Sequence, residues 1–68
     1  MENNMLAANI KKLRKKHNLS QEQLAQKADI TYSTLIKIES GNNTNPTLDT
    51  LTKLASVFKI KIDELVGK

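Results

Sequence analysis

The side chains that could do chemistry in this sequence point to electrostatic binding rather than to catalysis. Eleven Lys and Arg residues against seven Asp and Glu residues give a formal net charge of +4 and an isoelectric point near 9.6. On so small a body this excess favours a polyanionic partner. The single histidine, His17, cannot form a metal site alone, and there is no cysteine. With no nucleophile paired to a base and little volume for a pocket, we expect no enzymatic activity, no metal and no cofactor.

Length and composition set the scale of the fold. A chain of 68 residues forms one small domain, expected to span residues 1–68. A domain of this size buries only about 60% of the surface that its unfolded chain exposes, so helix packing or self-association must stabilise it. The lack of cysteine fits a reducing cytosol, and we expect a cytoplasmic protein. No apolar run approaches the ~20 residues of a membrane span, and Met1–Leu6 has no secretory signal pattern.

The spacing of apolar residues predicts an all-α fold of five short helices, because no alternating pattern is long enough to build a sheet. Ser20, Thr31 and Thr47 are suited to cap the second, third and fourth helices, and Gly41 suits the end of the third. The expected helices cover residues 5–16, 21–28, 32–40, 48–58 and 62–66.

Two of these helices have a clear division between faces. In the first helix, Leu6, Ile10 and Leu13 share one face. Four lysines lie on the opposite face, which is either simply solvated or makes one or two DNA contacts. The fourth is interpreted as a core helix, because its apolar residues keep helical spacing: Leu48, Leu51, Leu54, Ala55 and Phe58.

Two short helices joined by a three-residue turn describe a helix-turn-helix over about residues 20–40. The run 20–28, followed by Ile30, Thr31, Leu35, Ile38, Glu39 and Gly41, resembles the phage-repressor/Cro-like (Xre-type) helix-turn-helix family. The stretch 45–55 resembles the fourth helix of that family, so the resemblance covers about residues 6–66. It implies a compact five-helix bundle of the lambda-repressor-like DNA-binding type. The chain departs from the family at Asp29, where glycine is usual; aspartate tolerates the left-handed conformation better than most residues.

The resemblance implies that the third helix, about residues 32–40, is a recognition helix that enters the major groove. Lysine can donate to guanine, serine can donate or accept, and tyrosine can pack against a base or reach a phosphate. Ile36 would meet a thymine methyl group, or else is a partly buried edge residue. The expected base-reading residues are Tyr32, Ser33, Ile36 and Lys37.

Other positions match phosphate contacts of the family. Gln21 opens the second helix, whose N-terminus favours an anion, although it could instead be a solvated first-turn residue. The polar loop after the third helix would meet the DNA backbone, or else is a purely structural turn. The expected phosphate-contacting residues are Gln21, Thr31, Asn42, Asn43, Thr44 and Asn45.

Two further features follow from the resemblance. Arg14 and Glu39 are expected to form a structural ion pair between the first and third helices, with independent surface charges as the alternative. Repressor-like proteins bind two half-sites as two-fold dimers, so we expect a homodimer. The last helix either closes the core or forms the dimer surface. The candidate dimer contacts are Phe58, Ile62, Leu65 and Val66.

The function expected from this resemblance is that of a small bacterial or phage repressor-like regulator. Its partner would be a two-fold symmetric operator in double-stranded DNA, with no membrane and no small-molecule ligand involved. The sequence leaves open a stand-alone repressor or activator, a restriction-modification controller and an antitoxin-like autoregulator. A protein-interaction module that kept the fold and lost its DNA affinity is the alternative from another class.

Overall fold

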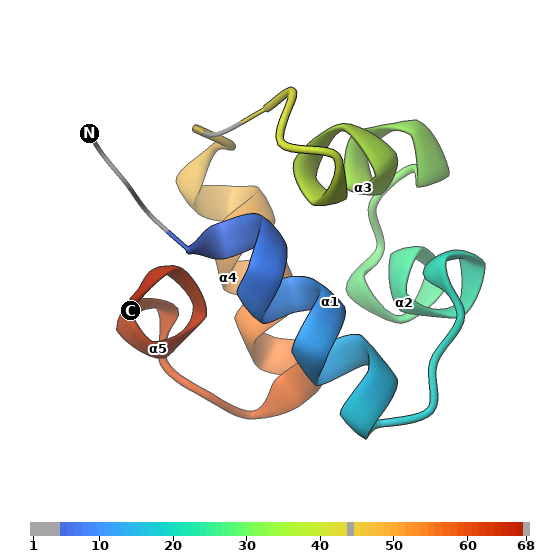
Figure 1. Cartoon of the computed structure of the whole chain (residues 1–68), viewed down its shortest axis with the longest axis horizontal. Helices are drawn as coiled ribbons and strands as arrows, with labels where there is room; N and C mark the ends of the chain where they lie inside the picture. Colours follow the sequence, from blue (N-terminus) through green and yellow to red (C-terminus); the bar gives the residue numbers. More distant parts are fainter. Residues whose placement is uncertain (1–4, 44, 68) are drawn as a thin grey trace.

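The computed structural model describes residues 5–43 and 45–67, and over these residues the chain forms five α-helices and no strand (Figure 1). The all-α expectation is confirmed, and the helix bounds differ from the expected ones by one residue at most. The helices are α1 (Leu6–Lys16), α2 (Gln21–Ala28), α3 (Tyr32–Glu39), α4 (Leu48–Phe58) and α5 (Ile62–Val66).

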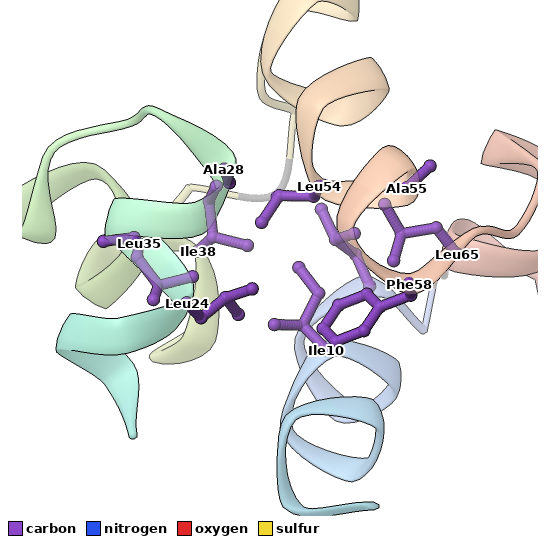
Figure 2. Packing of buried hydrophobic residues seen from close by; sticks show 11 residues of the cluster. Ile10, Leu24, Ala28, Leu35, Ile38, Leu54, Ala55, Phe58 and Leu65 are labelled. Atoms are coloured by element: carbon purple, nitrogen blue, oxygen red, sulfur yellow. The ribbon is translucent and has the colours of Figure 1, made fainter. Parts of the chain in front are cut away.

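One apolar core joins the five helices. α1 packs against α3 and α5, α2 packs against α3 and α4, and α4 also packs against α5. Figure 2 shows the buried side chains converging between the α2–α3 pair and the α4–α5 pair. Each fully buried Leu or Ile contributes about 1.5–3 kcal/mol relative to an exposed one. The core consists of Leu6, Ile10, Leu24, Ala25, Ala28, Leu35, Ile38, Leu54, Ala55, Phe58 and Leu65.

The expected N-caps fix where the middle helices begin. The Ser20 hydroxyl accepts from the Gln23 N–H at 3.0 Å, and the Gln23 Oε1 accepts from the Ser20 N–H at 2.8 Å, which completes a capping box. Thr31 and Thr47 each accept a hydrogen bond from the N–H three residues on. These contacts satisfy N–H groups that would otherwise lack partners at the helix starts.

A non-glycine residue in the left-handed conformation caps α2 and α4 and follows the C-cap of α1. In the turn between α2 and α3, Asp29 has φ 57°, and the Ile30 N–H returns to the Ala25 carbonyl at 3.0 Å. The Lys53 Nζ lies 3.4 Å from the Asp29 carbonyl oxygen, so α4 supports this turn. The departure from glycine therefore leaves the turn intact. The three left-handed residues are Asn18, Asp29 and Lys59.

Burial corrects two sequence-based expectations. The assignment of Leu48 to the core is wrong: it is 70% exposed, because it is the first residue of α4 and projects beyond the packed part of the helix. Phe58 and Leu65 were expected at a dimer contact, yet both are buried in the core of their own chain. Their side chains offer no surface to a partner, whereas Ile62 and Val66 are only partly buried.

Candidate nucleic-acid interface

α2, the turn over residues 29–31 and α3 form a helix-turn-helix whose inner side belongs to the core. Leu35, Ile38 and Glu39 face inward from α3 and are buried. The opposite face of α3 is open to solvent, and Figure 1 shows that helix at the rim of the bundle. An exposed polar face on a helix that is packed on its other side is the arrangement a groove-reading helix requires.

The residues expected to read bases fall on this open side of α3. Tyr32 is 49% exposed, and Ser33 and Lys37 are also exposed. Within the described part of the chain, the Lys37 ammonium has no ion-pair partner. Ile36 is half-buried, which places it at the edge between the core and the open face.

Arg14 and Glu39 meet in a two-pronged ion pair that ties α1 to α3. The Arg14 Nε donates to Glu39 Oε2 at 2.9 Å, and Nη2 donates to Oε1 at 3.2 Å. The Arg14 Nη1 also donates to the Leu19 carbonyl at 3.1 Å. The Glu39 side chain is only 3% exposed and that of Arg14 only 15%, so the pair is not made of independent surface charges. Guanidinium and carboxylate match geometrically in such a fork, which gives the pair directional specificity.

Gln21 lies between this ion pair and the open face of α3. Its Nε2 donates to Glu39 Oε1 at 3.0 Å, and its Oε1 accepts from the Tyr32 hydroxyl at 3.5 Å. Gln21 is half-buried rather than fully solvated. No pattern in the sequence indicates these contacts, because the partners of Gln21 come from another helix and the spacing of apolar residues does not encode them.

The loop after α3 has an internal hydrogen-bonded structure. The Asn43 N–H donates to the Lys37 carbonyl at 2.9 Å, and the Asn43 Oδ1 accepts from the Asn45 N–H at 3.0 Å. Asn42 and Asn45 are exposed, whereas Asn43 is half-buried. Thr44, which was also expected at a phosphate, lies outside the described residues. The side chain of Asn43 therefore holds the turn, and those of Asn42 and Asn45 remain on the surface.

Thr31 has a structural role at the start of α3. Its hydroxyl oxygen accepts from the Thr34 N–H at 3.1 Å and lies 2.8 Å from the Thr34 hydroxyl.

Over residues 5–43 and 45–67, no group of three His, Cys, Asp or Glu side chains is placed to hold a metal ion. In that same part of the chain, no helix is long and apolar enough to cross a membrane.

Comparison with known proteins places this geometry among DNA-binding regulators. The helix-turn-helix family model matches residues 10–65. A helix-turn-helix-type transcriptional regulator of Archaeoglobus fulgidus is 38% identical over 56 residues, which are 82% of this chain and 78% of that protein. The immunity repressor protein of Bacillus phage phi105 is 41% identical over 59 residues, which are 87% of this chain but 40% of the repressor.

Solved structures show the same fold. The N-terminal DNA-binding domain of SinR from Bacillus subtilis superposes with a TM-score of 0.89 at 33% identity, covering 94% of this chain and 93% of that domain. SinR has also been solved in complex with DNA, and that chain superposes with a TM-score of 0.87 at 33% identity, covering 93% of this chain and all of that one.

Proposed function

Because this chain belongs to the helix-turn-helix family, we propose that it is a transcriptional regulator that binds double-stranded DNA with α3 in the major groove. The observation that carries the proposal is the open polar face of α3, fixed to α1 from behind by the buried Arg14–Glu39 pair. Family members are DNA-binding regulators rather than enzymes. We place the protein as a single domain over residues 1–68, acting in the cytoplasm on nucleoid DNA.

The contacts of this interface with DNA would be of two kinds, those that position the protein and those that read bases. The half-buried Gln21 keeps a second Nε2 hydrogen for a phosphate, next to the N–H groups at the start of α2. Exposed Asn42 and Asn45 would contact the DNA backbone from the loop. The other phosphate contacts that we propose come from Thr31, Asn43 and Thr44. These contacts fix the register of the protein on the duplex without reading its sequence.

Ser33 and Lys37 would read base edges, because both are exposed on the open face of α3. Lysine supplies donors for guanine O6 and N7, and a serine hydroxyl serves as donor or acceptor. Tyr32 lies beside them at the start of the helix, and the exposed edge of Ile36 would meet a thymine methyl group.

We also propose that two copies bind one operator. Helix-turn-helix dimers place their recognition helices about 34–36 Å apart, which matches half-sites separated by 10–10.5 bp. Ile62 and Val66 are the partly exposed apolar residues of α5 that remain available for the contact. Sedimentation of the protein–operator complex should show two chains per site, and one chain per site would contradict the dimer.

The experiment that tests DNA binding is a salt titration with Lys37→Gln. Affinity for a selected site and for random DNA should both fall as salt rises, because lysines displace counterions from phosphates. Lys37→Gln should cost about 1–3 kcal/mol on the selected site if Lys37 reads a base, and should change the preference at one base position, because glutamine removes the charge but keeps a donor able to read a base. Loss of the charge alone would lower the slope of log affinity against log salt by about 1.

Lys59→Gln is the matched control, because Lys59 lies in the turn between α4 and α5, outside the helix-turn-helix. It removes the same charge and should leave the base preference unchanged. If wild-type protein bound neither selected nor random DNA, the protein would instead be an interaction module that retained the fold; equal binding to both would mean that α3 reads no base.

A further inference from the structure

A directional chain of hydrogen bonds runs from the core to the open face of α3. It begins at Glu39, whose carboxylate is 3% exposed and is held by two Arg14 donors. A carboxylate in an ion pair has only acceptor atoms. The group that approaches Glu39 Oε1 from Gln21, 3.0 Å away, must therefore be the Nε2 amino group and not the carbonyl oxygen. Oxygen and nitrogen of a glutamine amide are assigned from such networks, and here the network allows one assignment.

This assignment decides the direction of the next hydrogen bond. With Nε2 turned to Glu39, the Gln21 Oε1 faces the Tyr32 hydroxyl at 3.5 Å. A carbonyl oxygen only accepts, so Tyr32 must donate its single proton to Gln21. The contact is long for an O–H···O hydrogen bond and therefore weak. It still favours the inward orientation of the proton, because in the described part of the chain Gln21 is the partner of the Tyr32 hydroxyl.

We propose that this chain makes Tyr32 a hydrogen-bond acceptor that selects the orientation of one base pair, with the base that carries an exocyclic amino group, adenine or cytosine, on the strand facing the hydroxyl in the major groove. The inference rests on the proposed function and names one element of its specificity. With the proton turned inward, the hydroxyl presents only lone pairs to DNA. Adenine N6 and cytosine N4 are the donors of the major groove, whereas guanine O6 and N7, thymine O4 and phosphate oxygens are all acceptors. The 49% exposure of Tyr32 at the start of α3 gives the hydroxyl access to a base edge.

The first test is a selection from randomised DNA followed by affinity measurements on every single-base variant of the selected site. One base pair should be preferred in one orientation, with adenine or cytosine on the strand facing Tyr32, and Tyr32→Phe should abolish that preference while leaving the other positions unchanged. The preference lost should be about 2- to 10-fold, as expected for one neutral hydrogen bond. Ser33→Ala is the matched control, because it removes the neighbouring hydroxyl from the same helix face and should affect a different position.

The second test is Gln21→Met, which removes the acceptor for the tyrosine proton and leaves the Arg14–Glu39 pair in place. The freed hydroxyl can then donate as well as accept, so the preference at the Tyr32 position should decrease toward equality. Adding Tyr32→Phe should then change that preference little further. A purely positioning role of Gln21 would instead weaken binding by the same factor on all sequences.

A DNA site that lacks the amino group tests the same contact from the other side. If the preferred base is adenine, replacing it with purine removes the amino group. This replacement should weaken DNA binding by the wild-type protein about 2- to 10-fold more than it weakens DNA binding by the Tyr32→Phe variant. The inference is overturned if removing the amino group from the preferred pair weakens wild-type and Tyr32→Phe binding equally, or if Tyr32→Phe leaves every preference intact. Those results leave the proposed function standing, whereas wild-type binding without any base preference would overturn both.

Discussion

Arg14→Met tests the buried ion pair on which the orientation of α3 depends. The substitution keeps an unbranched side chain but removes all three hydrogen bonds of the guanidinium, two to Glu39 and one to the Leu19 carbonyl. The carboxylate of Glu39, 3% exposed, then retains the Gln21 amide as its partner at 3.0 Å. Removing one member of a buried pair leaves a charge that is neither solvated nor neutralised, and typically costs about 3–5 kcal/mol.

That loss is large compared with the stability of so small a domain. At about 0.05–0.15 kcal/mol per residue, the whole chain is expected to be stable by roughly 3–10 kcal/mol. For this size each 1 kcal/mol lowers the Tm by about 4–8 °C, so Arg14→Met should lower it by roughly 12–40 °C. Urea unfolding followed by circular dichroism measures the free-energy change. Lys15→Met is the control, because this exposed lysine on the same helix should change stability by no more than about 0.5 kcal/mol.

The double mutant separates a true pair from two independent charges. Arg14→Met combined with Glu39→Met should cost much less than the sum of the two single losses, because no unpaired charge remains and the site becomes apolar. Two results would refute the reasoning. One is additivity of the single losses within about 0.5 kcal/mol. The other is a cost of less than about 1 kcal/mol for Arg14→Met, which is the range of a solvent-exposed pair.

Two further predictions concern helix ends, and urea unfolding measures both. Lys59→Gly should stabilise the protein by about 0.5–1 kcal/mol, because Lys59 has φ 57°, which glycine adopts without the steric cost of a side chain; a loss of stability would contradict this. Thr47→Ala should destabilise by about 1 kcal/mol, because its hydroxyl accepts from the Thr50 N–H at 3.2 Å at the start of α4. Thr47→Ser, which keeps the hydroxyl, should lose much less stability. Equal losses of stability in the two variants would argue against the cap.

The sequence predicted the helices well because their ends are determined locally. Ser20 and Gln23 form the expected capping box, and Thr31 and Thr47 cap the helices that follow them. Burial was harder to predict, as the exposed Leu48 shows. The period of an apolar pattern tells which residues share a face, but not where the neighbouring helix ends. For the same reason, the pattern alone did not separate the core positions of α5 from those open to a partner.

The candidate site was predictable only as far as the family resemblance reached. The resemblance suggested Arg14 and Glu39 as partners, and the structure brings them together at 2.9 Å. It also suggested Gln21 for a phosphate contact. The hydrogen bonds of Gln21 to Glu39 and Tyr32 depend on how α2 and α3 pack, since the partners lie 18 and 11 residues away in the chain. No local propensity encodes contacts over such separations.

These shared contacts link the stability of the domain to its base preference. Glu39 Oε1 accepts from both Arg14 Nη2 and Gln21 Nε2, so one buried oxygen serves the ion pair and the orientation of the glutamine. When Arg14 is lost, the carboxylate is free to move, and with it the group that directs the Tyr32 proton. Lys59 has no part in this chain of contacts. Arg14→Met should therefore alter both the stability of the domain and the base preference at the Tyr32 position, whereas Lys59→Gly should alter stability alone.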